Sequence, residues 1–406
     1  MTTDPLPSDA TVSEMPGFQT RAIHHGYEPS ENLGALTPPI YMTSTFAFED
    51  AGGLSAVVAG DAEGYFYGRE HNPTQDLLER RIASLEGGED AVTAASGMAA
   101  ISMALLTLLS PGDELIVHHT LYSVTSTLVS QGLSRFGITI VSADLSTTEG
   151  LSRAIGPKAK IVYFETPLNP TGDVLDISAL SAVAHGANLL VVVDSTFASP
   201  AVQRPIEHGA DIVVHSLTKY INGHGDLLGG IVVGSAELIG RIRSVGLRFL
   251  TGAAISPMTC FLVLRGLKTL KLRMRQHGEN ALAVAQMLAA HPHVSFVRYP
   301  YLPTDPGFAI ASRQMTNGSG ILSFELRSGY EGAVRMMNRL RLVRRAVSLG
   351  DVESLIMHPG SIVEARRKTH PEATPGVGVT MGLLRLSVGL EESADIIQDL
   401  FQAIEG

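Results

Sequence analysis

The feature that most constrains the fold is a series of short apolar runs between residues 91 and 234. The runs occupy residues 91–96, 113–119, 138–144, 160–166, 189–196, 211–216 and 229–234. Each is rich in β-branched residues and too short for a helix, and helix-type segments lie between many of them. Strands that are apolar on both faces are typical of a parallel sheet covered by helices on both sides. The sequence therefore predicts an α/β fold with a mostly parallel seven-stranded sheet.

The character of the chain changes after about residue 265. One long helix is predicted at 267–291, shorter strands at 320–326, 344–350 and 383–389, and a closing helix at 391–406. We therefore expect an N-terminal arm at 1–63, a large α/β domain at 64–262 and a smaller α+β domain at 263–406. The arm has no sustained period, so we expect an irregular segment that contacts a neighbouring subunit, with disorder before about residue 16.

Composition excludes several classes of function. The 406 residues include 30 Lys and Arg against 40 Asp and Glu, which gives a net charge of −10 and argues against nucleic-acid binding. There is one cysteine, no apolar run of about 18 residues that could span a membrane, and no apolar signal segment at the N-terminus. We expect a cytoplasmic protein with no membrane partner and no bound metal.

One predicted strand ends in a lysine flanked by hydroxyl groups. The run at 211–216 is followed by Ser216, Thr218 and Lys219, and then by a turn rich in Gly, Asn and Asp. Desolvation at a strand end lowers a lysine pKa and leaves an amine able to attack a carbonyl, while the hydroxyls suit a phosphate. A carbonyl and a phosphate on one small molecule suggest pyridoxal 5′-phosphate (PLP). Alone, such a lysine is more often simply solvated, so other contacts are needed.

Other polar residues also follow predicted strands. Gly97 and Met98 begin a predicted helix, whose free N–H groups favour a phosphate. Asp194 either caps a turn or pairs with a pyridinium nitrogen, an interaction worth roughly 4 kcal/mol at about 4 Å. Tyr67 and Arg69 either belong to an ordinary loop before a helix capped by Thr74 or bind an anion.

Taken together, the segments resemble the Cys/Met metabolism family of PLP-dependent enzymes. The matching segments are YFYGREHNPT, SGMAAI, ETPLNPTG, VVVDSTFASP, HSLTKYINGHGD, VSLGDVESLIMHP and RLSVGLE. The resemblance implies a PLP-dependent transferase fold of type I, like that of aspartate aminotransferase. It also implies a homotetramer built as a dimer of catalytic dimers.

The same resemblance implies a role for each matching residue. Lys219 is expected to attach the cofactor, Asp194 to pair with its ring nitrogen, and Tyr122 to stack on the ring and act as a general acid. The other expected cofactor contacts are Tyr67 and Arg69 from the neighbouring subunit and Gly97, Met98, Thr196, Ser216 and Thr218. The expected contacts to the substrate carboxylate are Asn169, Ser348 and Arg385.

Within the family, the segments TRAIHHGYEP, GALTPPIY, LSRFGITI and RGLKTLKLRM most resemble those of the methionine γ-lyases. This implies γ-elimination on a γ-substituted L-amino acid, with L-methionine giving 2-oxobutanoate, methanethiol and ammonia. Cystathionine-handling members carry acidic residues where this chain has Phe66 and Val347. An apolar pair cannot neutralise an ammonium group but suits a methylthio group.

Three departures from that group leave the substrate open. Val124 replaces a cysteine, Arg248-Phe249 replaces a Lys-Asp pair, and residues 360–367 read GSIVEARR. Alternatives are a lyase acting on canavanine or homocysteine, and γ-replacement on an O-acylhomoserine, as in cystathionine γ-synthase or O-acetylhomoserine sulfhydrylase. Glu70 is a candidate partner for the canavanine guanidinium, although a solvated loop glutamate is expected more often. A binding protein without turnover is disfavoured, because the full catalytic set is present.

Overall fold

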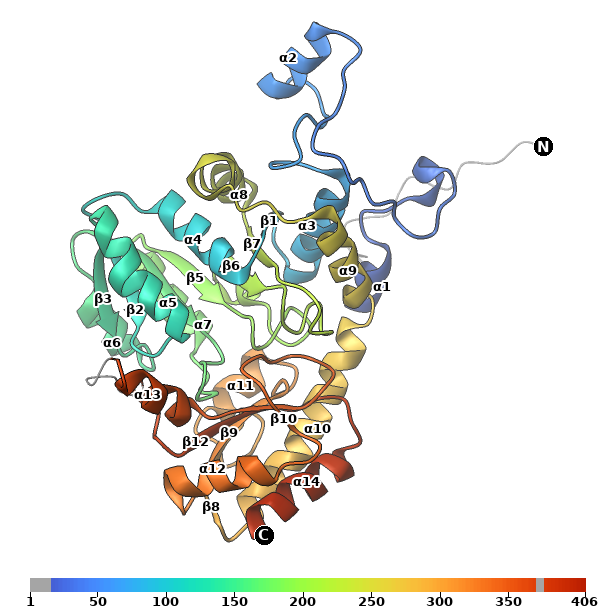
Figure 1. Cartoon of the computed structure of the whole chain (residues 1–406). Coiled ribbons are helices and arrows are strands. Elements are labelled where there is room, and N and C mark those ends of the chain that lie inside the picture. The colour runs from blue at the N-terminus through green and yellow to red at the C-terminus, as the bar shows by residue number, and fades with distance from the viewer. Residues whose placement is uncertain (1–15, 370–375) are drawn as a thin grey trace.

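The computed structural model describes residues 16–369 and 376–406, which form two sheets with helices around them (Figure 1). The larger sheet has seven strands in the order β1-β7-β6-β5-β4-β2-β3. Only β7 runs antiparallel to its neighbours, so the predicted mostly parallel sheet is confirmed. The strands are β1 Asp90–Ala94, β2 Glu114–His118, β3 Thr139–Ala143, β4 Ala159–Glu165, β5 Leu190–Asp194, β6 Ile212–Ser216 and β7 Gly230–Gly234.

Helices cover both faces of this sheet (Figure 1). Alternate residues of a strand enter different cores: Val192 of β5 packs in the layer beneath α4, whereas Val191 and Val193 pack on the opposite side. The helices are α3 Pro73–Glu86, α4 Gly97–Leu108, α5 Ser123–Thr127, η2 Leu128–Gly132, η3 Leu133–Phe136, α6 Thr148–Ala154, α7 Ile177–Gly186, η4 Pro205–His208, α8 Ala236–Arg241 and η5 Ile242–Thr251.

Helix α3 begins two residues earlier than the sequence suggested. The side chain of Asn72 accepts a hydrogen bond of 2.9 Å from the Thr74 N–H, so Asn72 is the N-cap. The expectation that Thr74 caps the helix is therefore wrong. Pro73 explains the shift, because its fixed φ suits the first helical position and it has no N–H to satisfy.

The second sheet lies in the C-terminal part and has the order β10-β11-β12-β9-β8. Its strands are β8 Val294–Arg298, β9 Ile321–Leu326, β10 Arg344–Arg345, β11 Leu355–Met357 and β12 Leu383–Ser387. The helices around it are α9 Pro257–Leu267, α10 Leu270–Ala290, α11 Phe308–Gln314, α12 Gly329–Arg339, α13 Pro359–Arg367 and α14 Ser393–Glu405. The strand predicted at 344–350 pairs only at its first two residues, and the remainder leaves the sheet.

The N-terminal part contains α1 Phe18–His24, η1 Pro29–Asn32 and α2 Ala51–Ala59, so the arm is less irregular than expected. Helix α1 packs against α3, whereas α2 lies at the tip of a segment that extends away from the body of the molecule (Figure 1). The disorder expected before about residue 16 concerns residues outside the described part. Several large apolar side chains of the arm are exposed, including Leu33, Leu36, Met42 and Val58. Within the described residues, no helix is long and apolar enough to cross a membrane.

Candidate active site

A cavity of about 230 Å³ opens at the carboxyl ends of β4, β5 and β6. Parallel α/β sheets bind ligands at this edge, because the loops that follow the strands converge there. Most of the residues predicted to form the site line the cavity: Gly97, Met98, Tyr122, Asn169, Asp194, Thr196, Ser216, Thr218, Lys219, Val347 and Arg385.

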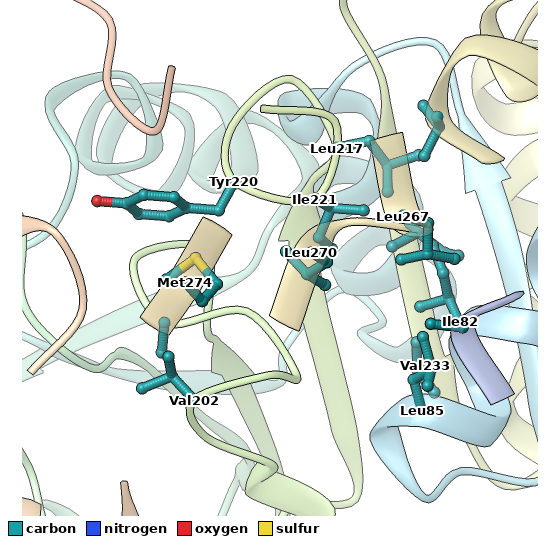
Figure 2. Close-up of a cluster of buried hydrophobic side chains, with 14 of the residues drawn as sticks. Ile82, Leu85, Val202, Leu217, Tyr220, Ile221, Val233, Leu267, Leu270 and Met274 are labelled. Atoms are coloured by element: carbon teal, nitrogen blue, oxygen red, sulfur yellow. The ribbon is translucent and has the colours of Figure 1, made fainter. Parts of the chain in front are cut away.

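Lys219 presents its amine to this cavity. Its Nζ donates a hydrogen bond of 2.9 Å to the Ser348 Oγ. Burial, with a smaller contribution from the charge of Arg385, lowers the pKa of Lys219 from 10.5 to about 8. The residues around it are fixed in the core: Leu217 and Tyr220 belong to the buried cluster between α3, β7 and α10 (Figure 2). The lysine therefore has a rigid base and a reactive amine.

The start of α4 forms an anion cradle beside this lysine. Ser96 caps the helix by accepting the Ala99 N–H at 3.1 Å, which leaves the Gly97 and Met98 N–H groups as the free donors at the helix end. A Cβ on Gly97 would come within 2.8 Å of the Ser216 Cβ, so the start of α4 can lie this close to the end of β6 only because this residue is glycine.

Two carboxylates end neighbouring strands in register, Glu165 on β4 and Asp194 on β5. Asp194 accepts the Thr196 N–H at 2.9 Å, and burial raises the pKa of its carboxyl. No cationic side chain of the described residues forms an ion pair with it. A protonated ring nitrogen would supply the missing partner.

Glu165 was missed by the sequence analysis, although it is the penultimate residue of the predicted strand at 160–166. Its Oε1 accepts the Tyr122 N–H at 2.8 Å, which fixes the chain that carries this tyrosine at the cavity. Burial and the neighbouring Asp194 raise the pKa of Glu165 well above its usual value. The pair therefore favours one negative charge over two.

Arg385 is only 3% exposed, and hydrogen bonds hold both terminal nitrogens of its guanidinium group. Its Nη1 donates to the Asn169 Oδ1 at 3.0 Å, and its Nη2 donates to the carbonyl oxygens of Val347 and Ser348 at 3.1 and 3.0 Å. The Nε is buried and has no acceptor among the described residues. Burial lowers its pKa to about 10, so the guanidinium stays charged at neutral pH. A buried, charged donor without a partner fits a substrate carboxylate.

Of the residues expected near the substrate side chain, Val347 lines the cavity and is 72% exposed, so it lies at the rim. Val124, on α5, is exposed and does not line the cavity. Met98, Ile101 and Leu228 add apolar surface to the wall.

Tyr67 and Arg69 do not line the cavity of their own chain. The Arg69 guanidinium lies over the Tyr67 ring, 5.2 Å from its centroid. Glu70 forms an ion pair of 3.3 Å with Arg248, and its side chain is 10% exposed. The expectation of a solvated Glu70 is therefore wrong: its guanidinium partner is Arg248, one of the departures noted in the sequence.

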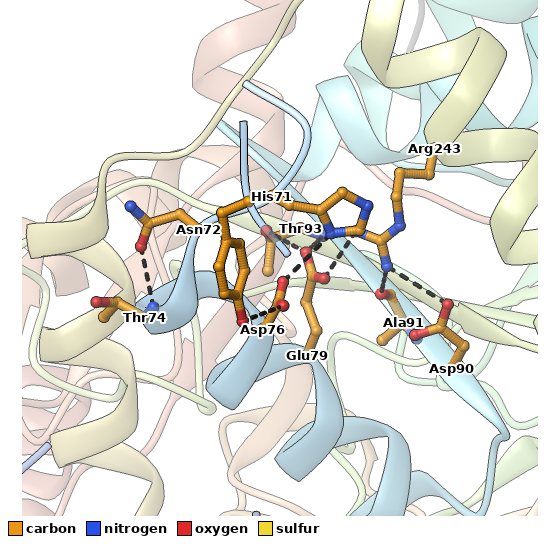
Figure 3. A network of polar contacts seen from close by, with 10 residues as sticks. His71, Asn72, Thr74, Asp76, Glu79, Asp90, Ala91, Thr93 and Arg243 are labelled. Atoms are coloured by element: carbon orange, nitrogen blue, oxygen red, sulfur yellow. Dashed lines mark hydrogen bonds and ion pairs between the residues drawn. The ribbon is translucent and has the colours of Figure 1, made fainter. Parts of the chain in front are cut away.

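A network of polar contacts fixes the helix that follows this loop (Figure 3). Glu79 of α3 accepts the N–H and O–H of Thr93 at 2.7 Å each, and it accepts Arg243 Nη1 at 2.8 Å. Arg243 also donates to the Ala91 carbonyl oxygen at 2.7 Å. The network joins α3, which follows the loop of Tyr67 and Arg69, to β1 and η5.

The site has the donor set that PLP requires. It offers an amine of lowered pKa for the aldehyde, N–H and hydroxyl donors for the phosphate, and a carboxylate without a cation for the ring nitrogen. The unpartnered Arg385 Nε is free for an amino-acid carboxylate.

Comparison with known proteins agrees with this chemistry. Residues 19–405 match the family described as Cys/Met metabolism PLP-dependent enzyme. The chain is 49% identical over 390 residues to an L-methionine gamma-lyase of Pseudomonas deceptionensis, which covers 96% of this chain and 97% of the relative. It is 46% identical to an L-methionine gamma-lyase of Pseudomonas putida, with 97% and 98% covered.

A cystathionine gamma-synthase of Mycobacterium bovis is 41% identical, with 96% of this chain and 97% of the relative covered. Among solved structures, the crystal structure of metB from Corynebacterium glutamicum superposes with a TM-score of 0.89 at 36% identity. That match covers 96% of this chain and 98% of the other.

Proposed function

The chain belongs to the Cys/Met metabolism family of PLP-dependent enzymes, and on that premise we propose that it cleaves L-methionine by γ-elimination. Methionine and water give 2-oxobutanoate, methanethiol and ammonia. The observation that carries the proposal is the Lys219 amine beside a buried Arg385 fork, in a cavity whose wall is partly apolar. The relatives named L-methionine gamma-lyase support the choice of methionine.

Arg385 would bind the substrate carboxylate through its free Nε, while Asn169 and two carbonyl oxygens hold the guanidinium plane. PLP supplies an electron sink that stabilises negative charge at the substrate carbons. Lys219 Nζ, held by Ser348, would take the Cα proton and return protons during the later steps, since one mobile amine reaches several positions. Tyr122 lines the cavity and would protonate the leaving thiolate.

The remaining residues would hold the cofactor. Asp194 would pair with the ring nitrogen and keep it protonated. The phosphate would rest on Gly97 and Met98 of α4 and on the hydroxyls that line the cavity at Thr196, Ser216 and Thr218.

We also propose an oligomeric enzyme, a homotetramer made of two catalytic dimers. Tyr67 and Arg69 would complete the phosphate site of the partner subunit, since they do not line the cavity of their own chain. The arm at 1–63 would make intersubunit contacts, beside a cofactor domain at 64–262 and a C-terminal domain at 263–406. We propose a cytoplasmic location, because the single cysteine, Cys260, is a buried free thiol.

A second candidate is γ-replacement on an O-acylhomoserine, which the similarity to a cystathionine gamma-synthase favours. To separate the two, the purified enzyme is given methionine, homocysteine, canavanine, cystathionine or O-acetylhomoserine, with and without added cysteine. The products are followed as 2-oxobutanoate and, by mass spectrometry, as thiols and thioethers. We expect fast release of 2-oxobutanoate and methanethiol from methionine. Thioether formation from O-acetylhomoserine, with slow methionine turnover, would instead assign a synthase.

A further inference from the structure

A second cavity of about 230 Å³ lies away from the active site, between the arm and helices α3 and α9. Figure 1 shows α3 and α9 side by side in this region. Its polar wall comes from Arg81 of α3 and from Arg265 and Lys268 at the C-terminal end of α9. Phe261 and Leu264 form an apolar wall. The cavity is thus lined by three cations and by no acidic residue of the described chain.

Arg81 is the central residue of this cavity. It is only 1% exposed, and its Nε donates to the His25 carbonyl oxygen at 3.0 Å. Its Nη1 is buried and has no acceptor among the described residues. Burial alone accounts for the lowering of the Arg81 pKa to about 10. A buried guanidinium of this kind is costly unless an anion compensates it.

No carboxylate of the described residues supplies this compensation. None of Arg81, Arg265 and Lys268 forms an ion pair within residues 16–369 and 376–406. Burial lowers the pKa of the nearby His25, and the positive charges of Arg81, Arg21 and Arg80 lower it further. The positive charge of this cavity is thus opposite in sign to the net charge of the chain, which is −10. It comes from the arginine and lysine side chains gathered at this one place.

We propose that this cavity binds one small tetrahedral oxyanion of the sulfate or phosphate class. Arg81 would supply the buried donor Nη1, and Arg265 and Lys268 would close the site from α9. The apolar wall of Phe261 and Leu264 strengthens each charged contact by lowering the local dielectric. The anion joins α3 to α9, so its binding stabilises the fold. This site is separate from the cofactor phosphate cradle at Gly97 and independent of the proposed reaction.

The test uses the full-length holoenzyme with excess PLP, so that the cofactor cradle is filled. Sulfate is titrated by calorimetry, and the melting temperature is measured in sodium sulfate and in sodium chloride of equal ionic strength. We compare the wild type with Arg265→Gln/Lys268→Gln and with the charge-matched control Lys271→Gln/Arg275→Gln, which lies on the exposed face of α10. Arg81→Met is a second variant, which replaces the buried charge with an unbranched apolar side chain.

We expect the wild type and the control to bind about one sulfate per chain and to melt higher in sulfate than in chloride. Binding should weaken by about tenfold or more in Arg265→Gln/Lys268→Gln, because two charged donors are lost. It should disappear in Arg81→Met, while methionine turnover stays unchanged in all variants. Equal sulfate affinity in the double variant and the control would overturn the proposal. So would the absence of saturable binding in the wild type, the result if a carboxylate of the chain or of a second copy fills the cavity.

Discussion

Lys219 decides, by its protonation state, how readily the protein attaches PLP. Only the neutral amine attacks an aldehyde, and the pKa of Lys219 is lowered from 10.5 to about 8. The rate of PLP uptake by the apoenzyme should therefore rise about tenfold per pH unit below pH 8 and level off above it. The uptake is followed by visible absorbance after mixing.

A lysine of ordinary pKa would instead show a rate that still rises between pH 8 and 10, and this result would contradict the assignment. The control is Lys219→Ala, which should bind PLP without covalent attachment. Borohydride treatment followed by peptide mass spectrometry should then find no labelled peptide, whereas the wild-type label should lie on Lys219.

Arg385 should act in substrate binding more than in the chemical step. Arg385→Lys keeps a positive charge but loses the planar fork that Asn169 and the carbonyls of Val347 and Ser348 hold. Losing a charge-assisted hydrogen bond of about 1.5–3 kcal/mol should raise KM for methionine by roughly 10- to 100-fold, with a smaller fall in kcat. Steady-state kinetics test this against Arg344→Lys, an exposed arginine of β10. A fall in kcat at constant KM would speak against a carboxylate fork.

The sequence predicted those site residues that stand out from their immediate neighbours in the chain. Lys219 and Asp194 each follow an apolar run, where a charge needs an explanation. Glu165 also lies at the end of such a run. Its importance depends on its pairing in register with Asp194, and neither segment alone shows which strands pair. Glu70 was misjudged for the same reason, because its partner Arg248 is distant in sequence.

At the scale of elements, the junction between β1 and α4 depends on a glycine. A Cβ on Gly97 would lie 2.8 Å from the Ser216 Cβ and 3.2 Å from its Cα, so Gly97→Ala must push α4 away from β6. We expect PLP affinity to fall by about tenfold or more, since the N–H donors move with the helix. Equilibrium dialysis of PLP measures the effect. Gly240→Ala on α8, where a Cβ meets nothing within 4 Å, is the control and should bind PLP normally.

The network of Figure 3 should carry much of the stability of this region. Arg243→Gln leaves Glu79 buried without its cation, and breaking a buried ion pair costs about 3–5 kcal/mol. Urea unfolding should therefore show a large loss. Arg275→Gln removes an exposed pair with Glu279 and should cost less than about 1 kcal/mol. Equal losses in the two variants would mean that the network adds no more than a surface pair.

The seven strands of the large sheet were predictable because each is a short run that is mostly apolar and rich in β-branched residues. Their order was not, because it depends on pairings between distant segments, and the reversal of β7 has no local signal. The predicted strand at 344–350 is a case in which local pattern indicated more strand than the structure has. Only Arg344 and Arg345 pair, and the rest of the segment instead brings Val347 and Ser348 to the active site.

At the scale of the whole molecule, the site of one chain lacks two of its expected ligands. Tyr67 and Arg69 do not line the cavity of their own chain, and the arm that precedes them carries exposed Leu33, Leu36 and Met42. Exposed apolar side chains of this number are typical of a surface that another protein covers. The proposed second copy of the chain would account for both observations, because the loop of one subunit would then complete the site of the other.

This arrangement predicts complementation between two inactive variants. In a mixed dimer of Lys219→Ala and Arg69→Ala subunits, one site carries both defects and the other carries neither. When equal amounts are co-expressed, about half of the dimers are mixed and one of their two sites is intact, so about a quarter of wild-type activity should return. Each variant expressed alone, assayed at limiting PLP, is the control and should be nearly inactive. If Arg69 served the site of its own chain, every site in the mixture would carry one defect, and no activity would return.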